Sequence, residues 1–201
     1  MKKSLKPVHL IHLLLFTPTA TDNNPVSILG RTRLVKMIFI FEKELSKYFQ
    51  DENNPINFDF EAYNFGPFSK KVYEAIDFLE SREIIELFPV SPHMMGRDEI
   101  KIDSTLMESE AEILIFQNED TYRSEGFQLT RRGVNMMKDP NIWFSWSQLS
   151  DEQKSVLINF KTKMINTTLK DILRYVYSKY PKFAEKSVIL DTIFPGEFSN
   201  E

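Results

Sequence analysis

The sequence predicts an α+β fold that is mainly helical, and two observations carry this prediction. Apolar residues recur at intervals of three and four over several long segments, as on the buried face of an α-helix. Short segments between them alternate apolar and polar residues, as in half-buried strands. With 201 residues, 42% of them hydrophobic, the chain is long enough for one large domain, or one domain with a helical extension.

The first two predicted helices occupy residues 7–16 and 32–49. Pro7 suits the first turn of a helix, and the turn formers of residues 17–24 end it. The second helix carries apolar side chains on a wide face, so we expect it to be largely buried at the centre of the fold. Turn-forming residues end it, and residues 58–63 then alternate as in a strand.

A third helix is predicted after the turn at residues 66–67, with Ser69 as its N-cap. A strand is predicted at residues 83–88, and a second strand returns at residues 127–129, before a short helix that Thr130 can cap. Two helices, a strand, a long variable loop and a returning strand occur in the order of a winged helix-turn-helix. The sequence therefore predicts a winged core with a small antiparallel sheet, in which the long loop is the wing.

The C-terminal third is predicted to be helical. Ser150 and Gln153 have the spacing of a capping box at the start of one helix, and Thr168 can cap the next one, which Pro181 ends. These helices need an apolar surface to pack on, so we expect them to be appended to the winged core. We therefore predict a winged-helix domain over residues 1–140, with a wing insertion at about 89–126. A helical extension over 141–195 and a tail over 196–201 follow it.

Composition restricts the classes of function. The chain contains no cysteine, which excludes disulfides, a thiolate nucleophile and a cysteine-built zinc site. The apolar run of residues 10–16 is shorter than the roughly 20 residues that span a bilayer, and no cleavage site of a signal peptide follows it. We therefore expect a cytoplasmic protein with no membrane span and no cofactor.

Patterns of catalytic and metal-ligating residues are weak. His9 and His12 share a helix face, but no carboxylate in that helix completes a metal site, and His93 is isolated. The segment DEIK, residues 98–101, is similar to the carboxylate and lysine pattern of some nucleases, which also needs a carboxylate on an adjoining strand. An enzyme is therefore not expected, and a nuclease-like activity is the most distant alternative.

Charge is distributed unevenly along the chain. The net charge of -4 argues against a protein whose main task is to coat a phosphate backbone. Residues 98–125, in the predicted wing, hold nine acidic and two basic residues. Four contiguous apolar residues in this acidic segment are predicted to form either an extra strand of the wing or a strand that binds a partner: Ile113, Leu114, Ile115 and Phe116.

A DNA-binding role would use the second helix of the helix-turn-helix, whose first side chains enter the major groove, together with nearby basic residues. The candidate residues are Arg31, Arg33, Ser69, Lys70, Lys71, Tyr73, Arg131 and Arg132. In the alternative interpretation, the two lysines belong to a solvated helix face. Arg31 and Arg33 then hold the start of the central helix against nearby carboxylates.

Two aromatic clusters are candidates for contacts with a protein. Trp143 and Trp146, together with Phe144, either anchor a partner or attach the C-terminal helices to the core. The second cluster either docks a partner or forms the seam of a homodimer, and it consists of Tyr175, Tyr177, Tyr180 and Phe183.

Several motifs together resemble one group of proteins. In chain order they are GRTRLVKMIF (30–39), YNFGPFS (63–69), VYEAI (72–76), FQLTRRG (127–133), and LRYVY (173–177) followed by YPKF (180–183). This order is similar to that of the YwgA-like proteins and, more distantly, of the Panacea-domain proteins typified by the SocA antitoxin. The resemblance spans roughly residues 8 to 190 without residues 89–126, and it implies a winged-helix fold. It also implies that a chain of this kind acts by binding and neutralising a protein.

The sequence thus favours a winged-helix binding module that recognises a protein partner, such as a toxin or an effector of a defence or stress system. A sequence-specific DNA-binding regulator is the alternative. The acidic wing departs from the resembling group and favours the protein partner over DNA.

Overall fold

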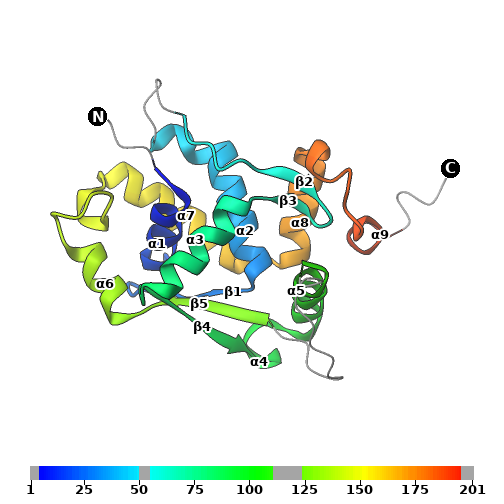
Figure 1. The fold of residues 1–201 in the computed structure, drawn as a ribbon, viewed down its shortest axis with the longest axis horizontal. Helices are drawn as coiled ribbons and strands as arrows, with labels where there is room; N and C mark the ends of the chain where they lie inside the picture. Colours follow the sequence, from blue (N-terminus) through cyan, green and yellow to red (C-terminus); the bar gives the residue numbers. More distant parts are fainter. Residues whose placement is uncertain (1–4, 50–54, 111–123, 196–201) are drawn as a thin grey trace.

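A computed structural model of the protein describes residues 5–49, 55–110 and 124–195. Helices predominate in it, and two small antiparallel sheets accompany them, so the predicted α+β class is confirmed (Figure 1). Among the described residues, no helix has the length and apolar character that crossing a membrane requires.

The central helix is α2 (Arg31–Ile40), in which every residue from Thr32 to Ile40 is buried, as its wide apolar face predicts. It continues as a π-helical turn, Phe41–Leu45, and a 3-10 turn, Ser46–Tyr48. Helix α1 (Pro7–Phe16) begins at the predicted proline and packs against α3 (Lys70–Ser81). The Ser69 hydroxyl accepts from the Val72 amide at 3.3 Å, which confirms this N-cap.

A β-hairpin stands between α2 and α3. It consists of β2 (Glu61–Tyr63) and β3 (Gly66–Phe68), with Tyr63 opposite Gly66. The sequence predicted one strand over residues 58–63 and a plain turn at residues 66–67, so the strand is shorter than expected and its partner was missed. Gly66 has φ +84°, and a methyl group there would overlap the ring of Tyr177, so the site requires glycine.

The main sheet has the strand order β1-β5-β4, with both pairings antiparallel. Its strands are β1 (Ile28–Leu29), β4 (Ile85–Val90) and β5 (Ser124–Leu129). The expected long loop between β4 and β5 is wrong for residues 92–110, which form helices α4 (Pro92–Met95) and α5 (Arg97–Glu110). Helix α5 was not predicted from the sequence because its buried face is partly polar, so no continuous apolar stripe marks it.

The C-terminal third is helical, as predicted. Its elements are α6 (Arg131–Lys138), η3 (Trp146–Gln148), α7 (Asp151–Asn166), α8 (Leu169–Lys179), η4 (Pro181–Phe183) and α9 (Leu190–Ile193). Thr130 and Thr168 cap α6 and α8, and Ser150 forms the expected capping box with Gln153, so these three local predictions are confirmed.

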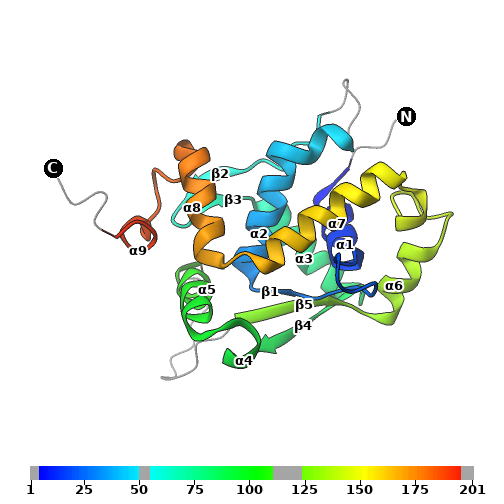
Figure 2. The same cartoon turned by 180° about the vertical axis from the view of Figure 1, so that it is seen from behind.

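The helices form layers. Helix α3 lies on one side of α1 and α2, and α7 and α8 lie on the opposite side, as the two opposed views show (Figures 1 and 2). Side chains from both the predicted winged domain and the predicted extension share one apolar core. The outer side of α3 is therefore left uncovered by the C-terminal helices.

Candidate functional site

Two of the residues proposed for DNA contacts are buried. The Arg33 side chain is 6% exposed, and its guanidinium donates to the carbonyls of Met164 and Thr167 and pairs with Glu99 at 3.0 Å. Ser69 is 0% exposed and its hydroxyl donates to the Phe58 carbonyl at 2.5 Å. Neither side chain lies on the outer surface, where a DNA phosphate would reach it, and the small exposed part of Arg33 lines a pocket.

Arg31 has a structural partner as well. Its guanidinium donates from two nitrogens to one carboxylate oxygen of Glu125, at 3.1 and 2.7 Å, and lies over the rings of Tyr73 and Phe127, 5.5 and 5.6 Å from their centroids. The ion pairs of Arg31 and Arg33 agree with the alternative interpretation, in which both arginines hold the start of α2 against carboxylates.

The remaining basic candidates lie on the surface. Lys70 is 82% exposed and lies 3.5 Å from Glu74, and Lys71 pairs with Asp59 at 2.5 Å. Arg131 and Arg132 are exposed in the first turn of α6. Helix α3 itself carries two basic and three acidic residues, so its outer side has no excess of positive charge.

The tryptophans attach the segment after α6 to the N-terminal helix. Trp143 packs edge-on against His9 with ring centroids 4.7 Å apart, and Trp146 packs against Phe16 at 5.8 Å. The four apolar wing residues proposed for partner binding, Ile113, Leu114, Ile115 and Phe116, lie outside the described residues.

The C-terminal aromatic cluster packs mainly on its own chain. Tyr180 and Phe183 contact Phe39 of α2 at 5.1 and 4.8 Å, and Tyr177 is buried. Tyr175 is 39% exposed, and its hydroxyl donates to Glu44 at 2.6 Å.

A strip of three aromatic rings lies at the start of α3, and of its residues the sequence singled out only Tyr73, as a candidate for DNA contacts. Tyr63 of β2, Phe68 of β3 and Tyr73 of α3 follow one another with ring centroids 5.1 and 5.0 Å apart. All three are partly exposed, and Tyr63 reaches 38%. The sequence does show aromatic residues before and after a Gly-Pro pair. Only the pairing of β2 with β3, however, brings their rings together.

Buried polar contacts hold this hairpin and the segment before it to the central helix and the turn that follows that helix. Lys36 Nζ of α2 donates to the Pro67 carbonyl at 2.9 Å, and the Glu42 carboxylate of the π-helical turn accepts from the amide of Phe58, which precedes β2, at 2.5 Å. Both side chains are buried. Because the hairpin is tied to the central helix, its rings are held in position before any partner binds.

The outer side of α3 continues from this strip. Helical spacing places Lys70, Glu74 and Asp77 along its middle, with Tyr73 at one margin and Phe78 at the other. Phe78 is 47% exposed and its ring lies under the Arg82 guanidinium at 5.5 Å. We call the area formed by Tyr63, Phe68, Tyr73 and Phe78 the α3 surface.

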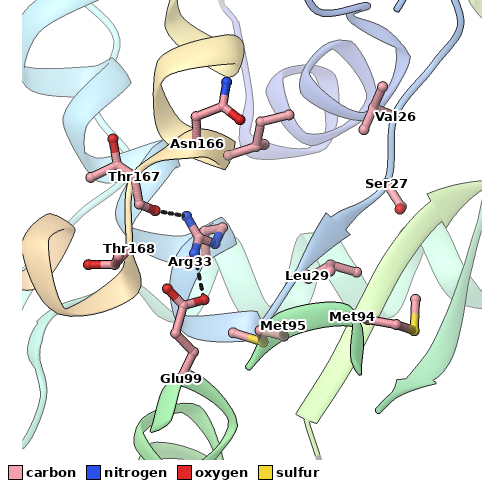
Figure 3. Close-up of a pocket in the computed structure, with 11 residues that line it drawn as sticks. Val26, Ser27, Leu29, Arg33, Met94, Met95, Glu99, Asn166, Thr167 and Thr168 are labelled. Carbon is pink, nitrogen blue, oxygen red and sulfur yellow. Dashed lines mark hydrogen bonds and ion pairs between the residues drawn. The ribbon is translucent and has the colours of Figure 1, made fainter. Parts of the chain in front are cut away.

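A pocket lies on another side of the molecule, around Arg33 (Figure 3). It has a volume of about 380 Å³ and opens between the start of β1, helices α4 and α5, and the α7–α8 junction. The Glu99 carboxylate that pairs with Arg33 also accepts from the Leu169 amide at 2.8 Å, and so caps α8.

Other ionisable side chains serve the fold. Lys161 of α7 is 0% exposed and donates to the carbonyls of Leu15, Thr17 and Val26, and its burial lowers the pKa of the ammonium group to about 7. His12 bonds the Gly133 carbonyl, and burial lowers its pKa. The described part of the chain contains no group of three or more acidic or histidine residues placed to hold a metal ion.

Comparison of the chain with protein-family models, with curated proteins and with solved structures found no match.

Proposed function

We propose that this chain is a non-enzymatic winged-helix binding module of the cytoplasm that recognises a protein partner through the α3 surface. Two features support the winged-helix part of this proposal. The elements α1, β1, α2, α3, β4 and β5 follow one another in the order of that fold, and their three strands form one antiparallel sheet. The β2–β3 hairpin is an addition between the two helices that would form the helix-turn-helix.

The observation that carries the protein-binding proposal is the combination of exposed rings and balanced charge on the α3 surface. Aromatic side chains that are rigidly held and half-exposed are the residues that most often anchor protein interfaces. The lysines beside them already face Glu74 and Asp59. A surface of this kind gains more from burying its rings against a protein than from contacts with phosphates.

The kind of partner follows from the resemblance noted in the sequence. An antitoxin-like module, or an accessory subunit of a defence or stress system, restrains a toxin or effector by covering part of it. The α3 surface suits that role because α7 and α8 lie on the opposite side and leave it open (Figures 1 and 2).

DNA binding is the second candidate, and the exposed positions of Lys70, Arg131 and Arg132 favour it. If DNA is the ligand, replacing Lys70 by Glu lowers the affinity for genomic fragments and flattens its dependence on salt. Lys163→Glu is the matched control, because Lys163 is exposed on α7, on the side opposite α3. Equal binding by both variants would remove α3 from any DNA interface.

The protein-binding proposal is tested by purifying tagged variants from the host. We expect Phe78→Ser to reduce the recovery of one specific protein at least tenfold, because a lost aromatic anchor costs about 2 kcal/mol or more. Met94→Ser is the control: Met94 has a similar exposure of 49% but lies on α4, outside the α3 surface. Both variants keep the melting temperature of the parent, since both side chains are on the surface. Equal recovery with both would reject the α3 surface as the binding site.

A further inference from the structure

The pocket around Arg33 has the size and the lining of a small-molecule site. Its volume of about 380 Å³ lies within the range of roughly 300–1,000 Å³ that is usual for ligand pockets. In Figure 3 the guanidinium lies between the α7–α8 junction on one side and Leu29 and the methionines of α4 on the other. No residue of the α3 surface lines it, so the pocket is a separate feature.

The floor of the pocket is polar but electrically balanced. Arg33 is 5% exposed as a residue, and its charge is compensated by Glu99 at 3.0 Å. A guanidinium has five N–H donors, and the contacts of Arg33 within the described residues use Nη1 and Nη2 but not Nε. The Ser27 hydroxyl, which also lines the pocket, has no hydrogen-bond partner within those residues. The floor therefore offers hydrogen-bond donors without an excess of charge.

The walls are apolar and adaptable. Met94 and Met95 of α4 line one side with Leu29, and Met94 is 49% exposed at the opening. Thioether side chains change shape at low cost and make favourable contacts with aromatic rings. Leaving Met94 in water is unfavourable, whereas a ring placed against it would cover both methionines.

We propose that this pocket binds a small neutral aromatic molecule that carries a hydrogen-bond acceptor, as in an aromatic amide. The acceptor meets the donors of Arg33 and Ser27, and the ring packs on Met94 and Met95. A charged ligand of either sign is disfavoured because Arg33 and Glu99 already neutralise each other, so its charge would lose hydration without gaining a counter-charge. Such a ligand touches α2, helices α4 and α5, and the α7–α8 junction at once, so its binding stabilises their packing.

The test uses benzamide as the probe and the full chain labelled at its methionine methyl groups. In NMR titrations we expect benzamide to shift the Met94 and Met95 signals with half-saturation at about 1–10 mM, the range for so small a ligand. Benzoate and benzylammonium, of the same shape but opposite charges, should shift them at least fivefold less at equal concentration. Met136, on α6 and outside the pocket, is the internal control.

Two pocket-filling variants complete the test. Ser27→Trp places a ring inside the pocket, and Asn166→Trp places one at its exposed edge, so that one of them remains usable if the other fails to fold. Benzamide shifts of Met94 and Met95 that disappear in a folded variant support the proposal. It is overturned if benzamide leaves both signals unchanged, shifts Met136 equally, acts unchanged on a folded filled variant, or binds no better than the charged probes.

Discussion

At the scale of single residues, the buried lysine of α7 shows how one side chain can join distant segments. Lys161 Nζ donates at 2.7 and 2.6 Å to the carbonyls of Thr17 and Val26, and at 3.3 Å to that of Leu15. These carbonyls belong to the end of α1 and to the segment that leads into β1. The lysine therefore fixes both to α7, while the carbonyls replace only part of the water that burial removes.

Lys161 makes the stability of the fold depend on pH. Its pKa is about 7 in the folded chain and about 10.4 in an unfolded one, so between these values the unfolded chain holds a proton that the folded chain lacks. Raising the pH through this window favours the folded state. We expect the free energy of unfolding, measured with urea, to rise more from about pH 7 to pH 10 in the parent than in Lys161→Met. Parallel curves for the two proteins would show that the lysine titrates normally.

At the scale of secondary-structure elements, local signals in the sequence succeeded where the partners are close along the chain. Ser69, Thr130 and Ser150 each cap the helix that directly follows them, and three-residue spacing is enough to recognise such caps. Helix α5 was not predicted, for the opposite reason. Its polar residues Glu99 and Asp103 point inward, to backbone amides about 70 positions away in the sequence.

Asp103 illustrates the role of α5. It is 0% exposed, and its carboxylate accepts from the Thr32 amide in the first turn of α2 at 2.9 Å and from the Ser124 hydroxyl at 2.6 Å. Since Gly30 at the N-cap position has no side chain to perform this task, α5 supplies the cap from a distance.

We expect Asp103→Ala to lower the free energy of unfolding by about 1–3 kcal/mol, because it leaves a buried amide and a buried hydroxyl without their acceptor. The loss should be accompanied by faster hydrogen exchange in α5 and in the first turn of α2. Arg97→Ala, at an exposed position of the same helix, is the control and should change little. If the free energy of unfolding is unchanged, or if hydrogen exchange becomes faster in neither α5 nor the first turn of α2, the cap contributes nothing to the fold.

The exposure of the candidate DNA-binding residues could be predicted only in part from the sequence. Lys70 and Lys71 are on the surface, as their positions off the apolar stripe indicated, and Arg131 and Arg132 are exposed as well. Arg33 and Ser69 are buried by residues of other segments, Arg33 by Thr167 far along the chain and Ser69 by Phe58 before the hairpin. Long-range contacts of this kind leave no local pattern.

At the scale of the whole molecule, the layered arrangement decides which surface is free. Helices α7 and α8 cover one side of α1 and α2, and α5 covers the start of α2, whereas the outer side of α3 is left open on the other side (Figures 1 and 2). The hairpin that carries Tyr63 and Phe68 is tied to α2 and extends this face. We propose that a protein partner binds here.

The most direct test is photo-crosslinking in the host with a light-activated phenylalanine analogue at single positions. At position 78, on the α3 surface, we expect one dominant adduct with a protein, and at position 94, on α4, none. A second position on the strip, Tyr63, should give the same adduct, because it belongs to the same surface. Adducts only with nucleic acid, or equal adducts at positions 78 and 94, would contradict the proposal that the α3 surface binds a protein.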